Sequence, residues 1–496
     1  MASFIASLLL LLLFLFVLKQ SVAAPDIPSS NPSPVDSLPP LKTTLLAATD
    51  LLTLLESANQ ADIVEEKRGT LETCEELLRI SISNLKESLS VVADLSKVRG
   101  LLSSVLTNHR TCMEGIRSTS GPLKDVLESS FRHSYEQINT SLSVIYKALL
   151  LQEPRHHRRR ISSAKWLSRN DRLVLEAPVT SFHPGDVITV AADGSGNFST
   201  ISDAIRLAVP DKSDRRTVVR IKKGVYRELL QIPTSKTNVF LVGEGDGQTV
   251  ITGNRNSVDG WQTYQTATVG VSGRGFMARD ITFENTAGPA KHQAVALRVN
   301  ADFAAFYHCG IHGFQDTLYA HSGKQFYREC KISGTIDFIC GDASAVFQSC
   351  QVISKKPLPW QLTTVTAQSR GVPTQDSGFS FHRCSILASP DLASSPGKNY
   401  LGRPWQAYSR TVILDSDIGG HIDPAGWSPW EGKDFADTVY YGEYGNHGPG
   451  SSTAGRVRWK GFHAMSYQDT SPFMVSPFIW ADKWLPSTNF PYDPSI

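Results

Sequence analysis

The sequence lacks the features that would tie it to nucleic acid, to a metal ion or to a membrane interior. Its formal net charge is only +2, and it has no stripe of lysine and arginine interleaved with aromatic residues, so no nucleic-acid partner is expected. It has no CxxC motif and no matching histidine cluster, so we predict neither a metal site nor a cofactor. Beyond Leu18 no apolar run approaches the length of a membrane span.

The one long apolar run, Phe4 to Leu18, is too short to span a bilayer comfortably. It is followed by the small residues Ser21-Val22-Ala23, which are typical of a cleavage site. We therefore predict a secretory signal peptide over residues 1–23 and a soluble, extracellular mature chain. The run has no basic residue before it and is followed by Lys19, so a signal anchor is the alternative.

Secretion permits disulfide bonds and glycosylation. Of the seven cysteines, Cys74 and Cys112 lie in the N-terminal region, where they are candidates to clamp two helices together. The remaining disulfide candidates are Cys309, Cys330, Cys350 and Cys384, with pairs 309–330 and 330–350 both open. Cys340 lies outside their repeat and is our choice for the unpaired thiol. Asn139 and Asn197 begin tripeptides of the glycosylation-acceptor form.

The chain divides into two regions with different periodicities. In residues 24–153, apolar residues recur every three or four positions from Leu41 to Leu151, which predicts a bundle of about four helices. Residues 154–183 form a linker whose basic run, PRHHRRR, is either a solvated connection or a site for a processing protease. Residues 184–496 read as strands, apart from an amphipathic stretch, Ser199 to Val209, that would cap the first coil. Gly426 to Ile496 is too irregular for strands, and we expect it to wrap over the far coils.

A triplet of an aromatic, a cysteine and a β-branched residue occurs three times at intervals of about 20 residues in the second region, and a fourth time after a longer interval. Such a period predicts a solenoid, in which each coil buries its apolar face against its neighbours. The short β-branched segments with Gly, Asn and Ser between them favour a parallel β-helix over a helical solenoid. The triplets are Phe306/Cys309/Ile311, Tyr327/Cys330/Ile332, Phe347/Cys350/Val352 and Phe381/Cys384/Ile386.

Four polar residues follow the same period. Asp316 and Asp337 are 21 residues apart, and Gln293 precedes Gln315 by 22 residues. Because neighbouring strands lie roughly 4.8 Å apart, these side chains should sit on successive rungs of one face, within reach of a single substrate group. Each aspartate alone is more simply explained as a turn or capping residue, but two glutamines and two aspartates in register favour a site.

The chain closely resembles plant pectin methylesterases (pectinesterases) that carry an N-terminal inhibitor-like pro-region. The resemblance covers nearly everything after the predicted signal peptide. It implies a right-handed parallel β-helix catalytic domain, preceded by an all-α four-helix-bundle inhibitor-like domain. The motifs that carry it are TATVGVSG, KHQAVALRV from Lys291, GFQDTLY from Gly313, GTIDFICGDA from Gly334, YLGRPW from Tyr400 and PAGWSPW from Pro424.

The resemblance implies a carboxylic ester hydrolase that removes methyl esters from cell-wall pectin (homogalacturonan), giving methanol and pectate. Asp337 would be the nucleophile, with Asp316 as general acid/base, Gln293 and Gln315 stabilising the oxyanion, and Arg403 orienting Asp337. Substrate contacts would come from Tyr264, Gln293, Tyr319, Arg403, Trp405 and Trp427. We expect a secreted cell-wall monomer whose partners are pectin and a proteinaceous pectinesterase inhibitor.

The chain departs from the family pattern at three points. The family's DFIFGNA reads DFICGDA, so Cys340 replaces a groove aromatic and Asp342 adds a negative charge near an acidic product. These changes put substrate affinity or preferred methylation pattern in doubt, but not the reaction class. The pro-region lacks the N-terminal cysteine pair usual in related inhibitor domains, and the processing motif occurs only approximately, so cleavage of the pro-region is less certain than catalysis.

Two other functions remain open. Paired carboxylates on a β-helix also suit a pectin lyase or glycosidase, although a lyase would need a carboxylate cluster for Ca²⁺, which the sequence lacks. The helical region alone would suit an inhibitor, and Cys340 leaves open a catalytically weakened pectin-binding protein.

Overall fold

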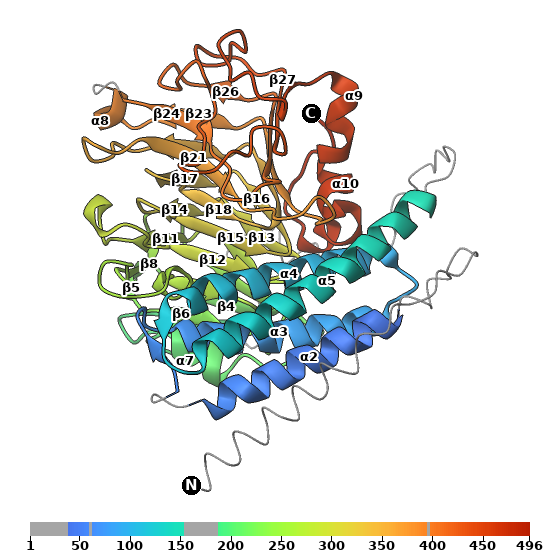
Figure 1. Ribbon diagram of the computed structural model, residues 1–496. Coiled ribbons are helices and arrows are strands. Elements are labelled where there is room, and N and C mark those ends of the chain that lie inside the picture. Colours follow the sequence, from blue (N-terminus) through green and yellow to red (C-terminus); the bar gives the residue numbers. More distant parts are fainter. Residues whose placement is uncertain (1–37, 59–61, 153–186, 394–396) are drawn as a thin grey trace, which may run out of the picture.

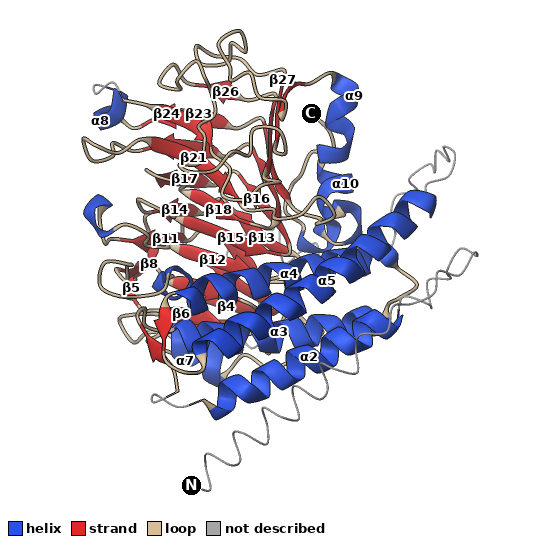
Figure 2. Cartoon of the chain, in the orientation of Figure 1, coloured by secondary structure: helices blue, strands red, loops and turns tan. Residues whose placement is uncertain are grey.

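The computed structural model describes residues 38–58, 62–152, 187–393 and 397–496, so the predicted signal peptide and linker lie outside the described residues. The strands form a parallel β-helix that rises from residue 187 toward the C-terminal region, as Figures 1 and 2 show. A bundle of long helices from the N-terminal region packs against its lower half, and short C-terminal helices run along one side. The stacked parallel strands and the separate helical bundle match the predicted fold class.

Three parallel sheets make up the walls of the β-helix. The eleven-stranded sheet contains β3 (Val187–Val190), β4 (Thr217–Ile221), β7 (Val239–Val242), β10 (Met277–Arg279), β13 (Ala304–Tyr307), β16 (Lys324–Arg328), β19 (Ser344–Gln348), β22 (Gly378–His382), β25 (Arg410–Leu414), β27 (Tyr440–Tyr444) and β28 (Phe462–Ala464). The eight-stranded sheet contains β5 (Gly224–Arg227), β8 (Thr249–Gly253), β11 (Thr282–Asn285), β14 (Gly310–His312), β17 (Lys331–Gly334), β20 (Gln351–Ser354), β23 (Ser385–Ala388) and β26 (Asp417–Ile418). The seven-stranded sheet contains β6 (Leu230–Ile232), β9 (Val269–Val271), β12 (Leu297–Asn300), β15 (Leu318–Ser322), β18 (Ile339–Gly341), β21 (Thr363–Gln368) and β24 (Asn399–Gly402).

The aromatic members of the predicted triplets form a continuous stack inside the β-helix. The ring centroids of Phe306 and Tyr327 are 4.9 Å apart, those of Tyr327 and Phe347 4.8 Å, and those of Phe347 and Phe381 4.5 Å, with interplanar angles of 7° to 11°. Rings at this spacing gain stacking energy beyond the burial of their apolar area. The predicted coil period is therefore confirmed, and it fixes the register of the neighbouring turns.

The cysteines of the same triplets are buried free thiols, so the disulfides predicted for Cys309, Cys330, Cys350 and Cys384 are wrong. In three of the four, Sγ points to the carbonyl oxygen of an aromatic residue in the coil before it. Sγ of Cys330 lies 3.6 Å from Phe306 O, that of Cys350 3.4 Å from Tyr327 O, and that of Cys384 3.3 Å from Phe347 O. Burial raises the pKa of the Cys330 and Cys384 thiols and keeps both protonated.

Both ends of the β-helix are covered. The predicted N-terminal cap is the helix α7 (Ile201–Leu207), whose first turn is capped by Thr200 and whose Ile201 and Ile205 are buried in the core. The C-terminal region differs from the prediction, because residues 440–444 and 462–464 are the strands β27 and β28 that extend the largest sheet.

Phe435, Val457 and Trp459, which lie between β26 and β28, pack against the last coils of the core, as the predicted wrapping requires, whereas the residues after β28 lie along the side of the β-helix. Helix α8 (Pro390–Ala393) precedes β24, while α9 (Tyr467–Thr470) and α10 (Val475–Ile479) follow the last strand. Phe478 and Ile479 of α10 pack on outward-facing apolar residues of the eleven-stranded sheet, including Phe326 and Val346. This outer face is apolar and requires a cover.

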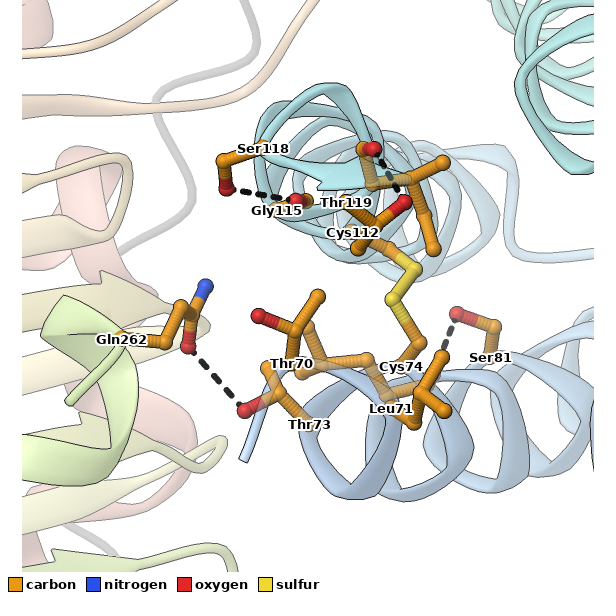
Figure 3. Close-up of a disulfide and its surroundings, with 12 residues drawn as sticks. Thr70, Leu71, Thr73, Cys74, Ser81, Cys112, Gly115, Ser118, Thr119 and Gln262 are labelled. Atoms are coloured by element: carbon orange, nitrogen blue, oxygen red, sulfur yellow. Dashed lines mark hydrogen bonds between the residues drawn. A yellow bond between two sulfur atoms is a disulfide. The ribbon is translucent and has the colours of Figure 1, made fainter. Parts of the chain in front are cut away.

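The described part of the N-terminal region contains four long helices, as predicted: α2 (Leu38–Ser57), α3 (Thr70–Ser90), α4 (Leu95–Arg117) and α5 (Lys124–Gln152). A two-stranded ribbon, β1 (Val64–Glu65) and β2 (Thr119–Ser120), joins the helix ends. The predicted disulfide between Cys74 and Cys112 is present and links α3 to α4 (Figure 3). In the described part of the chain, no helix combines the length and apolar character needed to cross a membrane.

The two acceptor asparagines lie in different surroundings. Asn139 is half-buried within α5, whereas Asn197 is exposed in a turn, where its Oδ1 accepts a hydrogen bond from Thr189 N at 2.8 Å. Their glycosylation stays a prediction.

The number of free cysteines can be measured by alkylation. Alkylation in denaturant without reductant should modify five cysteines per chain, and prior reduction should add only Cys74 and Cys112, since these two form the disulfide. Without denaturant the five thiols should react slowly because all are buried. Peptide mass spectrometry that finds fewer than five alkylated cysteines before reduction would contradict the assignment of five free thiols.

Candidate active site

The candidate residues lie in one row of turns, each of which leads into a strand of the seven-stranded sheet. Asp316 lies between β14 and β15, and Asp337 lies one coil later, between β17 and β18. Both have a left-handed backbone, with φ of 58° and 51°, which is uncommon outside glycine and concentrates at functional sites. Gln293 pairs with Gln315 in an isolated parallel bridge. The predicted placement on successive rungs is confirmed.

Asp337 is held by three hydrogen bonds to its carboxylate. Arg403 donates from Nε to Oδ1 at 2.8 Å and from Nη2 to Oδ2 at 2.6 Å, while the Thr364 hydroxyl donates to Oδ1 at 2.6 Å. The side chain of Asp337 is only 6% exposed. A bidentate guanidinium fixes the orientation of a carboxylate. Asp337 is therefore held in one orientation, with Oδ2 carrying fewer hydrogen bonds than Oδ1.

Asp316 has the opposite electrostatic surroundings. It is buried, and its backbone N–H is bonded to Ile336 O at 3.1 Å. Burial raises its pKa well above the ordinary value, the negative charge of Asp337 raises it further, and Arg403 opposes the shift. The carboxyl of Asp316 therefore keeps its proton over a pH range in which an exposed aspartate is ionised.

The two glutamines flank the carboxyl groups. Gln293 Oε1 accepts a hydrogen bond from the Ser257 hydroxyl at 2.6 Å, and the Ser257 backbone N–H donates to Gln293 O at 2.9 Å. Because the carbonyl end of this amide is occupied, its NH₂ end is the one oriented away from Ser257 and able to donate. Gln315 is nearly buried and lines the same cavity.

These residues surround a cavity of about 310 Å³. It is also lined by Tyr264, Tyr319, Trp405 and Cys340, so the sequence-based placement of these four at the site is confirmed. Tyr319 and Trp405 meet with ring centroids 6.0 Å apart. The rings supply flat apolar faces of the kind on which sugar rings pack.

Trp427 does not line this cavity, which corrects the prediction. It is buried at the end of the β-helix, stacks on Tyr441 at a centroid distance of 4.1 Å, and donates from Nε1 to Glu443 at 3.1 Å. The second tryptophan of the same motif, Trp430, lines the cavity instead, with Arg403 lying 4.4 Å from its ring centroid. A buried ion pair between Glu443 and Arg456 provides the acceptor that draws Trp427 inward.

Helices α3 and α4 form the roof of the cavity. Lys67, Thr111, Glu114, Gly115 and Ser118 line it from the N-terminal side. Leu77 and Ile80 of α3 are buried in a cluster with Tyr264, Tyr319 and Cys340, and the partly buried rings of Trp405 and Trp430 pack against that cluster.

Polar contacts hold the roof in place. Glu76 accepts hydrogen bonds from the Tyr264 hydroxyl at 3.1 Å and from the Ser272 hydroxyl at 2.8 Å. Thr73 donates to Gln262 Oε1 at 3.1 Å, one helical position before the disulfide (Figure 3). The helical region of the same chain therefore covers one side of the cavity.

Sequence reasoning missed Ser257, Thr364 and Trp430. The two hydroxyl residues had no distinguishing signal, since serine and threonine are common in such turns and strands. Trp430 lay in a motif already recognised, and only the contacts of the two tryptophans distinguish them.

The raised pKa of Asp316 makes a prediction about stability. Above pH 4 an unfolded chain loses this proton, because the ordinary aspartate pKa is about 3.9, whereas the folded chain retains it. The contribution to stability is thus full below that pH and is lost as pH rises through the raised pKa. Asp316→Asn should raise the thermal midpoint, by little at pH 4 and by more at pH 8.

The matched control for this experiment is Asp415→Asn, which removes an aspartate with φ of 50° from a turn that does not line the cavity. A difference between Asp316→Asn and the parent chain that does not grow with pH would contradict the assignment.

Comparison with known proteins places the chain in a family. The family model for pectinesterase matches residues 187–482, and that for plant invertase/pectin methylesterase inhibitor matches residues 28–145. The chain is 49% identical over 475 residues to Arabidopsis thaliana "Probable pectinesterase/pectinesterase inhibitor 12", covering 92% of this chain and 87% of that protein. It is 41% identical over 467 residues to Prunus persica "Pectinesterase/pectinesterase inhibitor PPE8B", covering 91% and 88%.

Among solved structures, the chain is similar to pectin methylesterase from carrot, with 47% identity and a TM-score of 0.62 over 64% of this chain and all of that one. An Aspergillus niger pectin methylesterase gives 32% identity and a TM-score of 0.53, over 61% of this chain and 97% of that one. The parallel β-helix fold and these matches agree, and the chain belongs to the pectinesterase family, with an inhibitor-like helical region at its N-terminal side.

Proposed function

We propose that the chain hydrolyses methyl esters of galacturonate units in cell-wall pectin, with Asp337 as the nucleophile and Asp316 as the general acid/base. The observation that carries the proposal is the contrast between two neighbouring carboxyl groups. Asp337 is paired with Arg403, whereas Asp316 is buried with a raised pKa. Such opposed environments divide acid and nucleophile between two residues of one type.

In the first half-reaction, Oδ2 of Asp337 attacks the ester carbonyl carbon. The carbonyl oxygen becomes an oxyanion that the Gln293 and Gln315 amides stabilise without neutralising Asp337. Methoxide is a poor leaving group, so Asp316 gives it a proton as the bond to the carbonyl carbon breaks. The products are methanol and an acyl-enzyme anhydride between the substrate and Asp337.

In the second half-reaction, water attacks the acyl carbon while Asp316, now ionised, accepts its proton. The bond to Asp337 Oδ2 breaks, which releases the galacturonate carboxyl and restores the starting protonation states. As the negative charge returns to Asp337, Arg403 stabilises it through the same two hydrogen bonds. Tyr319, Trp405 and Trp430 would pack on the sugar rings beside the scissile ester.

The polymer substrate and the location of the enzyme follow from the same assignment. A related pectin methylesterase, 25% identical over 62% of this chain with a TM-score of 0.50, is known in complex with a hexasaccharide, which supports an oligosaccharide ligand here. We infer secretion to the cell wall after removal of residues 1–23, a monomeric enzyme and a helical region over residues 24–153.

The nucleophile is tested by Asp337→Asn. An amide at this position cannot attack the ester, so methanol release from highly methylated pectin should fall at least about 1,000-fold, while the fold is kept. Asp415→Asn should retain the parent rate, because it removes an aspartate from a turn outside the cavity. Chain length and unsaturated products are followed in the same samples, and every variant is made in a chain that begins at Asp186, without the helical region.

Each other outcome has a distinct meaning. Methanol release by Asp337→Asn at the parent rate would refute the role of Asp337. Shortened or unsaturated chains without methanol would indicate a glycosidase or a lyase, and a parent chain without any reaction would favour the pectin-binding alternative.

A second function, intramolecular inhibition, is favoured by the position of the helical region over the cavity. The N-terminal helices cover the site where a polymer would have to lie, with Leu77 and Ile80 packed in the cluster of groove aromatics. Burial of two such side chains contributes roughly 3–6 kcal/mol to the contact. The helical region therefore blocks substrate while it stays in place.

A chain that begins at Asp186 should release methanol at least about tenfold faster than the full chain, because 1.4 kcal/mol of lost contact already corresponds to a factor of ten. Circular dichroism of both chains checks that the shorter one is folded. Equal rates of two folded chains would exclude the inhibitory role and leave the esterase assignment untouched.

A further inference from the structure

One face of α4 carries a row of polar residues against the β-helix. Arg99, Ser103, Thr107, Arg110 and Glu114 follow one another at intervals of three or four, so they share one side of the helix. The segment Ser369–Ser377 connects β21 to β22 and is called the 369–377 loop below. Arg99 and Ser103 contact this loop, and Thr107 and Arg110 contact the neighbouring Asp342.

Asp342 is the centre of this contact. Its side chain has no exposed surface, and three donors of its own domain hold it: Gln375 Nε2 at 2.7 Å, Ser377 Oγ at 2.6 Å and Gln368 Nε2 at 3.3 Å. All three donors are neutral, so they orient the carboxylate without cancelling its charge.

The cation comes from the helical region. Arg110 Nη2 donates to Asp342 Oδ2 at 2.8 Å, and the Thr107 hydroxyl donates to the same oxygen at 2.6 Å. Among the described residues, Arg110 is the one cation within ion-pair distance of Asp342. Arg370 and Arg410 lie near enough to interact electrostatically, but their guanidinium groups donate to backbone carbonyls of the 369–377 loop.

Two further residues of α4 fix its register on the loop through three hydrogen bonds. Arg99 donates to Thr374 O at 2.9 Å and to Gln375 O at 3.1 Å, and Ser103 Oγ accepts from the Asp376 backbone N–H at 2.9 Å. Gly371 leaves room for Arg110, since a Cβ at this position would lie 2.5 Å from Arg110 Nη1. The charges, the hydrogen bonds and the shape of α4 are therefore all complementary to the 369–377 loop and Asp342.

We propose that Asp342 and the 369–377 loop form a docking surface that selects an inhibitory helix carrying arginine at the position of Arg110, and that the chain's own α4 is this matched partner. The proposal rests on the proposed inhibitory function for its consequence, although docking itself is measured separately. A helix with a neutral or acidic residue at that position would leave Asp342 buried without a cation.

The energetics favour selectivity over raw affinity. Taking both charges out of water costs about as much as their attraction returns, so the pair adds little net affinity. Removing one partner leaves the other charge buried and is strongly unfavourable, which penalises every mismatched helix. An inhibitor domain from another protein is thus excluded by Asp342 unless it presents a cation there.

The test uses the full chain with a specific protease sequence placed within residues 154–183. After cleavage, size-exclusion chromatography over a dilution series measures how tightly the helical region stays bound to the β-helix. The parent should remain associated, and Arg110→Gln should weaken association about 100-fold or more. The double variant Arg110→Gln/Asp342→Asn removes both charges. Its helical region should bind at least tenfold more tightly than that of Arg110→Gln alone.

Two further variants act as controls. Arg132→Gln removes an exposed arginine that pairs with Glu128 on α5, and it should leave association within about twofold of the parent. Gly371→Ala alters the docking surface by shape alone and should also weaken association, because its Cβ would collide with Arg110.

Methanol release is followed in the same fractions. Additive losses in the double variant, or unchanged association in both Arg110→Gln and Gly371→Ala, would overturn the proposal. Dissociation of Arg110→Gln without a rise in methanol release would keep the docking surface and reject the inhibitory function instead.

Discussion

The structure depends on the register between parallel coils. Because the stacked rings of Phe306, Tyr327, Phe347 and Phe381 repeat at 4.5–4.9 Å, each coil starts at the same angular position as the one before. Every turn then recurs directly above its predecessor, and side chains 20 or so residues apart become neighbours. The proximity of Asp316 and Asp337 follows from this apolar stacking, with no contact between the two residues required.

This constraint explains how much the sequence could predict. The period of the aromatic triplets is visible in the sequence, and it implies the β-helix, the register and the row of polar turns that contains Gln293, Gln315 and both aspartates. The four helices and the α7 cap were also predictable, since amphipathic spacing is a local property. What could not be predicted depends on contacts between segments with no shared period. Trp427 and Trp430 stand three residues apart in one motif, and only the acceptor Glu443 decides which of them turns inward.

The stacked cysteines show a second limit of the period. The stacking of coils brings Cys309, Cys330, Cys350 and Cys384 together, as a disulfide framework would require, yet residues at the same register position project in parallel, and the sulfurs point to backbone carbonyls. Cys74 and Cys112 have no such period, and they are the pair that is bonded. The same position in successive coils therefore makes two side chains neighbours, but it does not orient them for a bond to each other.

The same reasoning separates the two causes of the raised pKa of Asp316. One is burial, and part of that burial comes from the roof of α3 and α4 over the cavity; the other is the negative charge of Asp337, which belongs to the β-helix itself. Removal of the roof admits water and weakens the first cause but leaves the second intact. In the proposed reaction, a galacturonate ring that enters the groove again excludes water from Asp316. Under that mechanism, the charge of Asp337 keeps the proton on Asp316 for the leaving methoxide after the roof is removed, and the bound substrate raises the pKa of Asp316 further.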